Sequence, residues 1–254
     1  MAYAFATRPT INHCVDVPRA RAAGVELMRV DIDLEAPTNH PAFSVLSAEE
    51  RAHASRYIRK DDALRFAATR LALRETLGER LGVPPRALRF ERDKNGRPRL
   101  TSQEGTGLSK TLDFNIAHSG HYALLVLSDR RRVGVDIEVV NRVGHWLSLS
   151  PTVFSPHEHA YVMSLPERFR DDVFYNVWTA KEAFLKALGT GIATGMAHFS
   201  VLSGNDDIPV ASLASPLWTS DREDSICVTA FDAARCPAPL DYAACVVWSR
   251  EITT

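Results

Sequence analysis

The feature that most constrains the fold of this 254-residue chain is that its second half repeats parts of its first. The segment His121–Ser128 (HYALLVLS) is similar to Asp241–Trp248 (DYAACVVW), with tyrosine, alanine and valine in the same order. Two Ser-x-x-Glu sequences, which begin at Ser47 and Ser155, also correspond, and this pattern is typical of a capping box at a helix start. Matches that keep their order along a chain favour an internal duplication.

A duplication predicts a pseudo-dimer of the α+β class, in which residues 1–128 and 129–254 form two similar halves. Each half would be a small, mostly antiparallel sheet packed with helices, and the cleft between the halves is a natural place for a ligand. The spacing of apolar residues and the turn signals predict a strand over Val25–Leu34, a helix over Asp61–Gly78, a hairpin around Asn95-Gly96, and strands from Phe114 and over Tyr122–Leu127.

Composition excludes several classes of protein. The formal net charge is −1, from 30 basic and 31 acidic residues, so no overall field points to nucleic acid or to a membrane. The four cysteines form no CxxC pair, which argues against a zinc site or a disulfide framework. No run of about 18 apolar residues could span a bilayer, and the first residues lack the apolar core of a secretory signal. We therefore expect a soluble, cytoplasmic protein.

One candidate for chemistry is the sequence Gly134–Glu138 (GVDIE), in which Asp136 and Glu138 interrupt an apolar, β-branched run. Because successive residues of a strand alternate between its faces, both carboxylates would project from one face. A single Asp-x-Glu pair on a strand is most often a solvated edge, but here valines surround it. Carboxylate oxygens suit Mg²⁺, which takes few protein ligands and completes its octahedron with water and phosphate oxygens.

A second candidate is Trp178–Lys186 (WTAKEAFLK), a sequence typical of a helix. Trp178, Glu182 and Lys186 follow one another at intervals of four residues, so they share one stripe of the helix. A lysine one turn from a metal-binding glutamate would neutralise the negative charge of those phosphate oxygens that the metal does not contact. Tryptophan at such a position is most often a core residue, and helical spacing predicts core packing for Val177, Ala180, Phe184 and Leu188.

Together with two further motifs, these sequences give the chain a resemblance to a known family. Lys94–Leu100 (KNGRPRL), Phe114–Gly120 (FNIAHSG), GVDIE and WTAKEAFLK, in this order, resemble the motifs of 4'-phosphopantetheinyl transferases. The resemblance covers most of the chain, and it is closer to the large monomeric kind that activates nonribosomal peptide and polyketide synthases. It implies that coenzyme A binds between the halves and that Mg²⁺ grips its pyrophosphate. A serine of an acyl or peptidyl carrier protein would attack the β-phosphate, and adenosine 3',5'-bisphosphate would be released.

The resemblance also implies roles for individual residues of the second half. Asp136, Glu138 and Glu182 match the magnesium ligands of the family. Glu182 also matches the residue proposed as the general base, although a carboxylate that holds a metal is a weak base. Lys186 matches the lysine that contacts the pyrophosphate. Lys181, next to Glu182, is expected to reach the edge of the cleft.

The first half is expected to make the contacts on the nucleotide side. His118 matches a family histidine near the 3'-phosphate, and Lys94 and Arg97 belong to a motif that lies beside the nucleotide. Arg97 stands where the family usually has lysine, which keeps the charge but changes its geometry. Ala117 stands where relatives often have serine, so one phosphate hydrogen bond is expected to be missing.

The first helix departs from some relatives, which carry lysines there toward the 3'-phosphate. Glu50 and His53 occupy the matching region of this chain. Cations that could substitute for those lysines are Arg59, Lys60 and Arg65, of which Arg65 is our candidate for cofactor binding.

Two other classes of function stay open at the level of sequence. One is a non-catalytic coenzyme A-binding protein with the same fold, and the other is a metal-dependent phosphohydrolase that uses water in place of the carrier serine. The sequence does not determine which carrier protein or pathway would be served, because that choice depends on surface complementarity.

Overall fold

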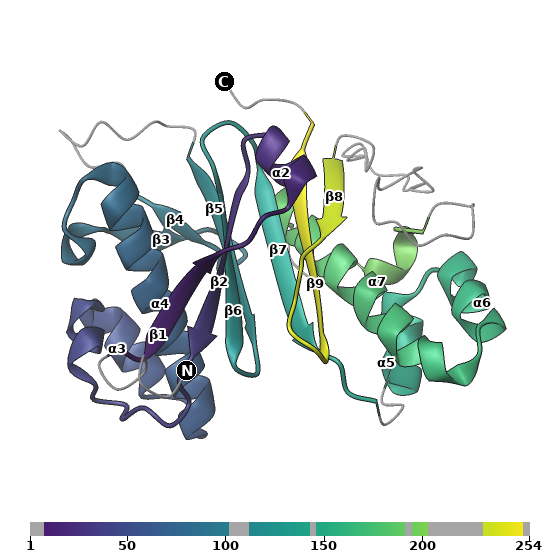
Figure 1. Cartoon of the computed structure of the whole chain (residues 1–254), viewed down its shortest axis with the longest axis horizontal. Coiled ribbons are helices and arrows are strands. Elements are labelled where there is room, and N and C mark those ends of the chain that lie inside the picture. Colours follow the sequence, from purple (N-terminus) through teal and green to yellow (C-terminus); the bar gives the residue numbers. More distant parts are fainter. Residues whose placement is uncertain (1–7, 102–111, 143–145, 191–194, 203–230, 251–254) are drawn as a thin grey trace.

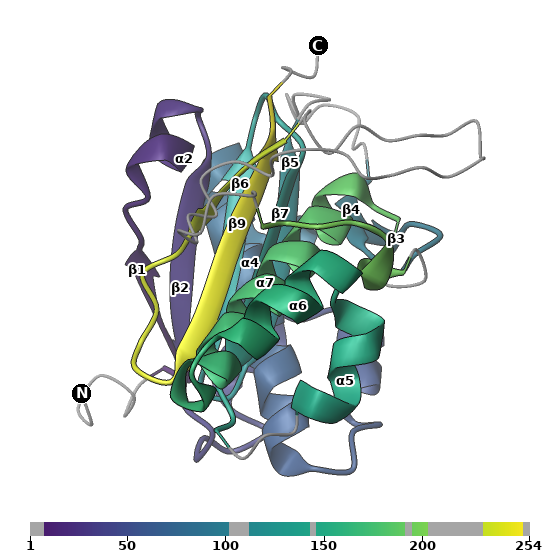
Figure 2. The ribbon, with the colours of Figure 1, turned by 90° about the vertical axis from the view of Figure 1, so that its right-hand side faces the viewer.

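The computed structural model describes residues 8–101, 112–142, 146–190, 195–202 and 231–250. Most of the described strands form two antiparallel sheets between two groups of helices, and two further strands form a separate hairpin (Figures 1 and 2). The first sheet has the order β1-β2-β6-β5 and the second the order β7-β9-β8. Their bounds are β1 Thr10–Cys14, β2 Glu26–Ile32, β5 Asp113–Ser119, β6 Tyr122–Ser128, β7 Val133–Val139, β8 Phe231–Arg235 and β9 Tyr242–Ser249.

Helices α3 and α4 of the first half lie on one side of the sheets in Figure 1, α5, α6 and α7 lie on the other, and the short helix α2 lies near β8. The elements of the first half are α2 (Pro18–Ala22), η1 (Pro41–Val45), α3 (Ala48–Ala54), α4 (Lys60–Leu81), η2 (Pro85–Ala87) and the hairpin of β3 (Phe90–Arg92) and β4 (Pro98–Leu100). Those of the second half are α5 (Trp146–Val153), α6 (Pro156–Ser164), α7 (Glu167–Leu188) and η4 (Met196–His198). No helix of the described segments is long and apolar enough to cross a membrane.

The same local signals begin and end helices in both halves. Ser47 and Ser155 each form the expected capping box with the glutamate three residues later. The long helices α4 and α7 both contain 22 residues, and each ends at a glycine in the left-handed region, Gly82 with φ 64° and Gly189 with φ 73°. Glycine adopts this conformation at little cost, so both helix ends are specified by the sequence.

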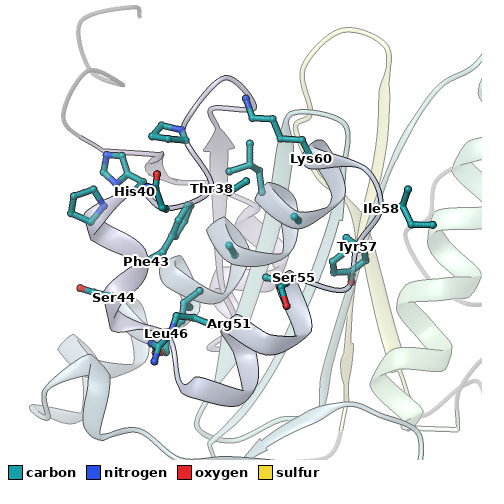
Figure 3. A pocket seen from close by; sticks show the side chains of 17 residues that line it. Thr38, His40, Phe43, Ser44, Leu46, Arg51, Ser55, Tyr57, Ile58 and Lys60 are labelled. Carbon is teal, nitrogen blue, oxygen red and sulfur yellow. The ribbon is translucent and has the colours of Figure 1, made fainter.

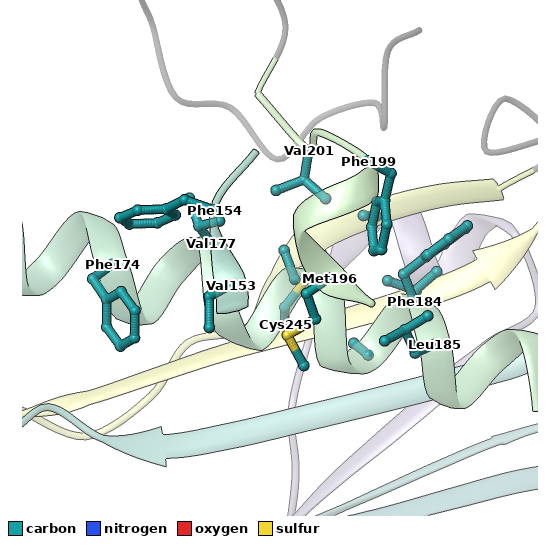
Figure 4. Packing of buried hydrophobic residues seen from close by; sticks show 14 of the residues in the cluster. Val153, Phe154, Phe174, Val177, Phe184, Leu185, Met196, Phe199, Val201 and Cys245 are labelled. Atoms are coloured by element: carbon teal, nitrogen blue, oxygen red, sulfur yellow. The ribbon is translucent and has the colours of Figure 1, made fainter. Parts of the chain in front are cut away.

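Strand alternation divides the apolar residues among three cores. Helix α4 covers the outer face of the first sheet, and α7 covers the outer face of the second, where Phe174, Phe184 and Phe199 pack together with Cys245 of β9 (Figure 4). The third core lies between the two sheets and includes Leu27, Val126, Val133, Val135, Ile137, Val246 and Trp248.

Side chains of β5 join the two sheets by bonding to the backbone of β7. Because alternate residues of β5 point the same way, they form a short polar ladder along the neighbouring strand. This ladder sets the position of β7, and with it the acidic residues of β7, against the first sheet. The acceptors are the side chains of Asp113, Asn115 and Ser119, and the donors are the backbone N–H groups of Val133 (2.9 Å), Val135 (3.0 Å) and Val139 (3.2 Å).

The α+β class with small antiparallel sheets is confirmed, and so is the hairpin around Asn95-Gly96. The prediction that the long first-half helix ends at Gly78 is wrong, because α4 continues to Leu81. Gly78 is required by packing instead, since a Cβ there would lie 2.9 Å from the carbonyl oxygen of Val83. The edge strand β1 was not predicted, because its sequence TINHC carries too few apolar residues to show alternation.

Candidate active site

Gly134 allows helix α7 to lie directly on strand β7. A Cβ at this position would be 2.0 Å from the carbonyl oxygen of Ala183 and 2.5 Å from the backbone nitrogen of Ala187. Any side chain here would therefore occupy the volume of the helix backbone, and glycine is the residue that permits so close an approach. The residues that follow Gly134 on this face of β7 consequently meet the C-terminal turns of α7.

Asp136 and Lys186 are the first pair that this approach brings together. Lys186 Nζ lies 2.6 Å from Asp136 Oδ1, and only 5% of the Asp136 side chain is exposed. Burial raises the pKa of Asp136, and the nearby ammonium limits that rise. Burial by itself would lower the pKa of Lys186, but Asp136, Glu182 and Glu138 raise it above its usual value. Lys186 is therefore charged at neutral pH.

Glu138 and Glu182 complete an acidic cluster around this pair. Burial and the field of Asp136 raise the pKa of Glu138 to about 7, although its hydrogen bond from Ser119 Oγ (2.9 Å) opposes the rise. Burial also raises the pKa of Glu182; Lys186 lowers it and Asp136 adds to the rise. The charge of Asp136 thus raises the pKa of both Glu138 on β7 and Glu182 on α7, and of these two glutamates only Glu138 lines the hollow beside Asp136.

The cluster does not have the geometry of an assembled metal site. Among the described residues, no three His, Cys, Asp or Glu side chains converge closely enough to hold a metal ion. The ammonium of Lys186 provides positive charge beside Asp136 instead. The second carboxylate oxygen, Asp136 Oδ2, is buried and has no hydrogen-bond partner among the described residues. A buried, unpartnered carboxylate oxygen is a ready ligand for a hard cation.

A hollow of about 320 Å³ opens beside this cluster, and residues of both halves line it. Asp136, Glu138 and Lys186 come from the second half. A second hollow of about 640 Å³, between α3, α4 and the β3–β4 hairpin, shares four lining residues with the first. The two hollows are therefore neighbours, with Arg70 and Arg92 lining both. First-half residues that line the smaller hollow include His53, Tyr57, Phe66, Arg70, Arg92 and His118.

A larger pocket of about 1210 Å³ lies over η1, α3 and the start of α4 (Figure 3). Phe43, Leu46 and Ile58 give it an apolar lining, and Lys60 lies at its rim (Figure 3). None of the residues that line it is acidic, and of these Tyr57 alone also lines the hollow beside Asp136. We therefore assign the candidate active site to the smaller hollow, which is lined by the carboxylates of Asp136 and Glu138 and by Lys186.

Of three residues predicted to contact the nucleotide, only His118 lines the active-site hollow. His118 of β5 lines the active-site hollow; desolvation and the charges of Lys186 and Arg65 lower its pKa, so its ring is neutral at pH 7. Arg65 does not line the hollow, and its guanidinium pairs with Asp62 and bonds to Gly120 O at 3.4 Å. Lys94 is exposed in the β3–β4 turn and lines neither hollow.

The expectation that Arg97 contacts a nucleotide is corrected by the structure. Only 8% of Arg97 is exposed, and its guanidinium bonds to Asp113 Oδ1 (2.9 Å) and to the carbonyl oxygen of Val133 (3.0 Å). It also bonds to the carbonyl oxygens of Phe114 and Lys186. Arg97 therefore ties β5, β7 and α7 together through Nη1 and Nη2, and its buried Nε has no partner among the described residues.

The expectation that Lys181 reaches the cleft is also corrected. Lys181 is fully buried, and its ammonium lies 2.5 Å from Glu158 Oε2 on the side of α7 that faces α6. Consecutive helical residues point about 100° apart, so Lys181 and Glu182 cannot both face β7. The structure places Glu182 there and Lys181 in the second-half core.

Sequence reasoning missed two arginines, Arg70 of α4 and Arg92 of β3, which line both hollows. Arg70 is 6% exposed, lies 5.5 Å from the ring centroid of Phe66, and its Nε has no partner among the described residues. Burial lowers its pKa to about 10, so it stays charged at pH 7. The signal that could have found it is an arginine within the otherwise apolar stripe of α4.

Comparison with known proteins agrees with this arrangement. Residues 132–247 match the 4'-phosphopantetheinyl transferase superfamily, and residues 36–130 match the N-terminal region of 4'-phosphopantetheinyl transferases. The chain is 38% identical over 193 residues to a provisionally named 4'-phosphopantetheinyl transferase of Synechocystis sp., with 74% of each chain covered. It is 34% identical over 169 residues to the 4'-phosphopantetheinyl transferase HetI of Nostoc sp., with 66% of this chain and 70% of HetI covered.

A third relative is the 4'-phosphopantetheinyl transferase ffp of Bacillus subtilis, which is 30% identical over 159 residues, with 63% of this chain and 67% of the relative covered. The chain belongs to the 4'-phosphopantetheinyl transferase family, and it is an enzyme of this class.

Proposed function

We propose that the protein transfers the 4'-phosphopantetheine group of coenzyme A to a serine of an acyl or peptidyl carrier protein, with Mg²⁺ as cofactor and adenosine 3',5'-bisphosphate as the second product. The observation that carries the proposal is the Asp136–Lys186 pair on a hollow lined by both halves. A diphosphate ester in this hollow would meet carboxylates and a lysine near its pyrophosphate, and Arg70 and Arg92 at its other end.

Asp136, Glu138 and Glu182 are the residues that would hold the magnesium ion. Their fit to a hard cation rests on the unpartnered Oδ2 of Asp136 and on the effect of Asp136 on the pKa of both glutamates. Bound Mg²⁺ would neutralise phosphate oxygens on which negative charge grows during the transfer. Lys186 would supply positive charge to the remaining pyrophosphate oxygens.

The chemistry also requires a proton acceptor. The hydroxyl oxygen of the carrier serine attacks the β-phosphorus, the bond from that phosphorus to the bridging oxygen breaks, and the bisphosphate leaves with that oxygen. Glu182 would accept the serine proton, directly or through a water, and this role is secondary to its role as a metal ligand because a carboxylate that holds a metal is a weak base. His118, which is neutral at pH 7, would donate a hydrogen bond to the 3'-phosphate.

Arg70 is proposed to bind the 3'-phosphate in place of the lysines that some relatives carry. Replacing Arg70 by methionine is expected to weaken binding of coenzyme A by about 10- to 100-fold, because a buried charge-assisted hydrogen bond contributes about 1.5–3 kcal/mol. Binding of 3'-dephospho-coenzyme A should change by less than about threefold. Titration calorimetry with both nucleotides measures the difference.

The matched control for Arg70 is Arg80→Met, on the same helix but outside both hollows, where Arg80 Nη1 pairs with Glu26 Oε1 at 2.8 Å. This variant should bind both nucleotides as the wild type does. Equal losses for the two nucleotides in Arg70→Met would show that Arg70 does not contact the 3'-phosphate.

We further propose that residues 1–128 and 129–254 are duplicated halves, with nucleotide-side contacts in the first and the metal site and catalytic helix in the second. The common strand order β2-β6-β5 and β7-β9-β8 and the two long helices of equal length support this division. The ligand cleft would be the hollow between the halves. We propose a cytoplasmic monomer that serves carrier proteins of nonribosomal peptide, polyketide or fatty-acid synthesis.

The experiment that tests the function is a mass-spectrometric panel of apo-carrier proteins from peptide, polyketide and fatty-acid systems, each incubated with coenzyme A, Mg²⁺ and the protein. We expect at least one carrier to gain one phosphopantetheine, and only when Mg²⁺ is present. Tight coenzyme A binding without transfer to any carrier would favour a non-catalytic binding protein. Release of phosphopantetheine from coenzyme A without a carrier would favour a phosphohydrolase.

A further inference from the structure

Lys181 of the catalytic helix is the centre of a buried network. Its Nζ lies 2.7 Å from each of three carbonyl oxygens, which belong to Val153 at the end of α5, to Met196 in η4 and to Phe199 after it. It also lies 2.5 Å from Glu158 Oε2, and both side chains are completely buried. We call this pair, Glu158 and Lys181, the second clamp, because it belongs to the second half of the chain.

Glu158 connects the second clamp to further segments. Its Oε2 accepts the backbone N–H of Ser155 at 2.8 Å, which is half of the α6 capping box, and its Oε1 accepts the N–H of Val201 at 2.8 Å. The ammonium also lies 4.9 Å from the ring centroid of Phe199. One point on α7 therefore holds the end of α5, the start of α6 and the segment after η4.

The first half contains an equivalent pair, Glu50 and Arg74, which we call the first clamp. Arg74 Nε lies 2.7 Å from Glu50 Oε2, and Arg74 Nη1 lies 3.0 Å from the carbonyl oxygens of both Pro85 and Leu88. Only 2% of Arg74 is exposed, and its guanidinium lies 5.1 Å from the ring centroid of Phe90.

The two clamps correspond feature by feature. Glu50 and Glu158 are both the N3 residue of a capping box. Arg74 and Lys181 are both the fifteenth residue of a 22-residue helix. In each half the cation bonds to two carbonyls around the 3₁₀ turn that follows this helix, η2 or η4, and it packs on a phenylalanine ring.

We propose that the clamp is a duplicated device that fixes each long helix, and that the second clamp positions the acidic site. Lys181 precedes Glu182 and lies five residues before Lys186, so the bond network behind α7 sets the rotation of the helix about its axis. That rotation determines where Glu182 points and how Lys186 meets Asp136. Lys181 is thus a positioning residue, and it touches no substrate. The part of this inference that concerns the acidic site rests on the proposed function.

Energetics explain why such a clamp holds a single geometry. A buried charge is strongly unfavourable unless it is paired and hydrogen-bonded, and the ammonium of Lys181 has four close acceptors. A rotation of α7 would remove some of these acceptors while the charge stayed buried. Removing one partner leaves the other uncompensated, whereas replacing both by apolar residues of similar volume is often tolerated.

The test compares two double variants, Lys181→Met/Glu158→Met and the matched control Arg74→Met/Glu50→Met. Each removes one clamp entirely. The measurements are the melting temperature without ligand, the rise in melting temperature caused by MgCl₂ in the presence of coenzyme A, and kcat and KM for transfer to a carrier protein.

We expect the second-clamp variant to need at least tenfold more Mg²⁺ for half of its thermal shift and to lose at least tenfold in kcat. The first-clamp variant should keep the Mg²⁺ requirement and kcat within about threefold of the wild type at a comparable loss of stability. Glu50 and Arg74 line the second hollow, so any effect of this variant on the nucleotide end should appear in the KM for coenzyme A and not in the Mg²⁺ requirement. The single variant Lys181→Arg, which copies the cation of the first clamp, should restore kcat above that of the double variant.

Equal Mg²⁺ responses and equal kcat values for the two double variants would overturn the positioning role. If Lys181→Met/Glu158→Met does not fold, the milder variant Glu158→Gln decides the question. A higher Mg²⁺ requirement together with a lower kcat supports positioning, and wild-type values of both contradict it. A wild type that modifies no carrier would instead refute the proposed function, and the Mg²⁺-induced thermal shift would still report on the clamp.

Discussion

Replacing Asp136 by asparagine is expected to lower kcat/KM for carrier modification by about 10³-fold or more, the loss expected when a preorganised charged group at a reacting phosphate is removed. Asp136 supplies the negative charge that holds Lys186 at 2.6 Å and the buried oxygen that is free to bind a cation. The asparagine is almost isosteric but carries no charge. Initial rates of carrier mass gain measure the effect, and the Mg²⁺-induced rise in melting temperature should disappear with it.

The matched control is Asp232→Asn in the same sheet, where the carboxylate of β8 pairs with Arg250 Nη2 at 3.1 Å outside the active-site hollow. This variant should keep wild-type turnover. Near-normal turnover in Asp136→Asn would refute the assignment of the metal site to the acidic cluster.

Substituting Gly134 by alanine is expected to cost about 3 kcal/mol or more of the free energy of unfolding, because the new Cβ would lie inside the backbone of α7. Neither the strand nor the helix backbone can move aside as a flexible side chain would. The helix must therefore shift away from β7, which would separate Lys186 from Asp136. Chemical denaturation measures the stability, and carrier modification should fall even at temperatures where the variant is folded.

Gly96→Ala provides the control for this prediction. Gly96 has φ 81° in the β3–β4 turn, and a Cβ there would meet no atom within 4 Å. The left-handed conformation should cost this variant only about 1–2 kcal/mol, without loss of turnover. A Gly134→Ala variant no less stable than Gly96→Ala would show that α7 does not lie on β7 as described.

The sequence predicted much of the site because the relevant signals are local. Alternation along β7 put Asp136 and Glu138 on one face, and the four-residue spacing on α7 put Glu182 beside Lys186. The capping boxes were equally readable, since each involves a serine and a glutamate three residues apart. Such patterns depend only on the geometry of one strand or one helix.

The predictions that Arg97 and Lys181 reach the ligand were wrong because they depend on tertiary contacts and not on local geometry. Both residues belong to motifs of the resembled family, and both are buried within the protein. A motif shows that a cation is present, but not whether its donors point to a ligand or to backbone carbonyls of a distant segment. Arg97 bonds across the junction of the two sheets, and Lys181 bonds to three segments that no local pattern connects.

The sequence by itself determined the two long helices, the two capped helix starts, most of the strands and the identity of the acidic residues, because backbone sterics and side-chain periodicity act over a few residues. Tertiary structure alone decided which face of α7 meets β7, and that Arg70 and not Arg97 opens into the hollow. Burial of charge is the physical reason. A cation in the interior must find its acceptors wherever packing supplies them, and those acceptors lie far away along the chain.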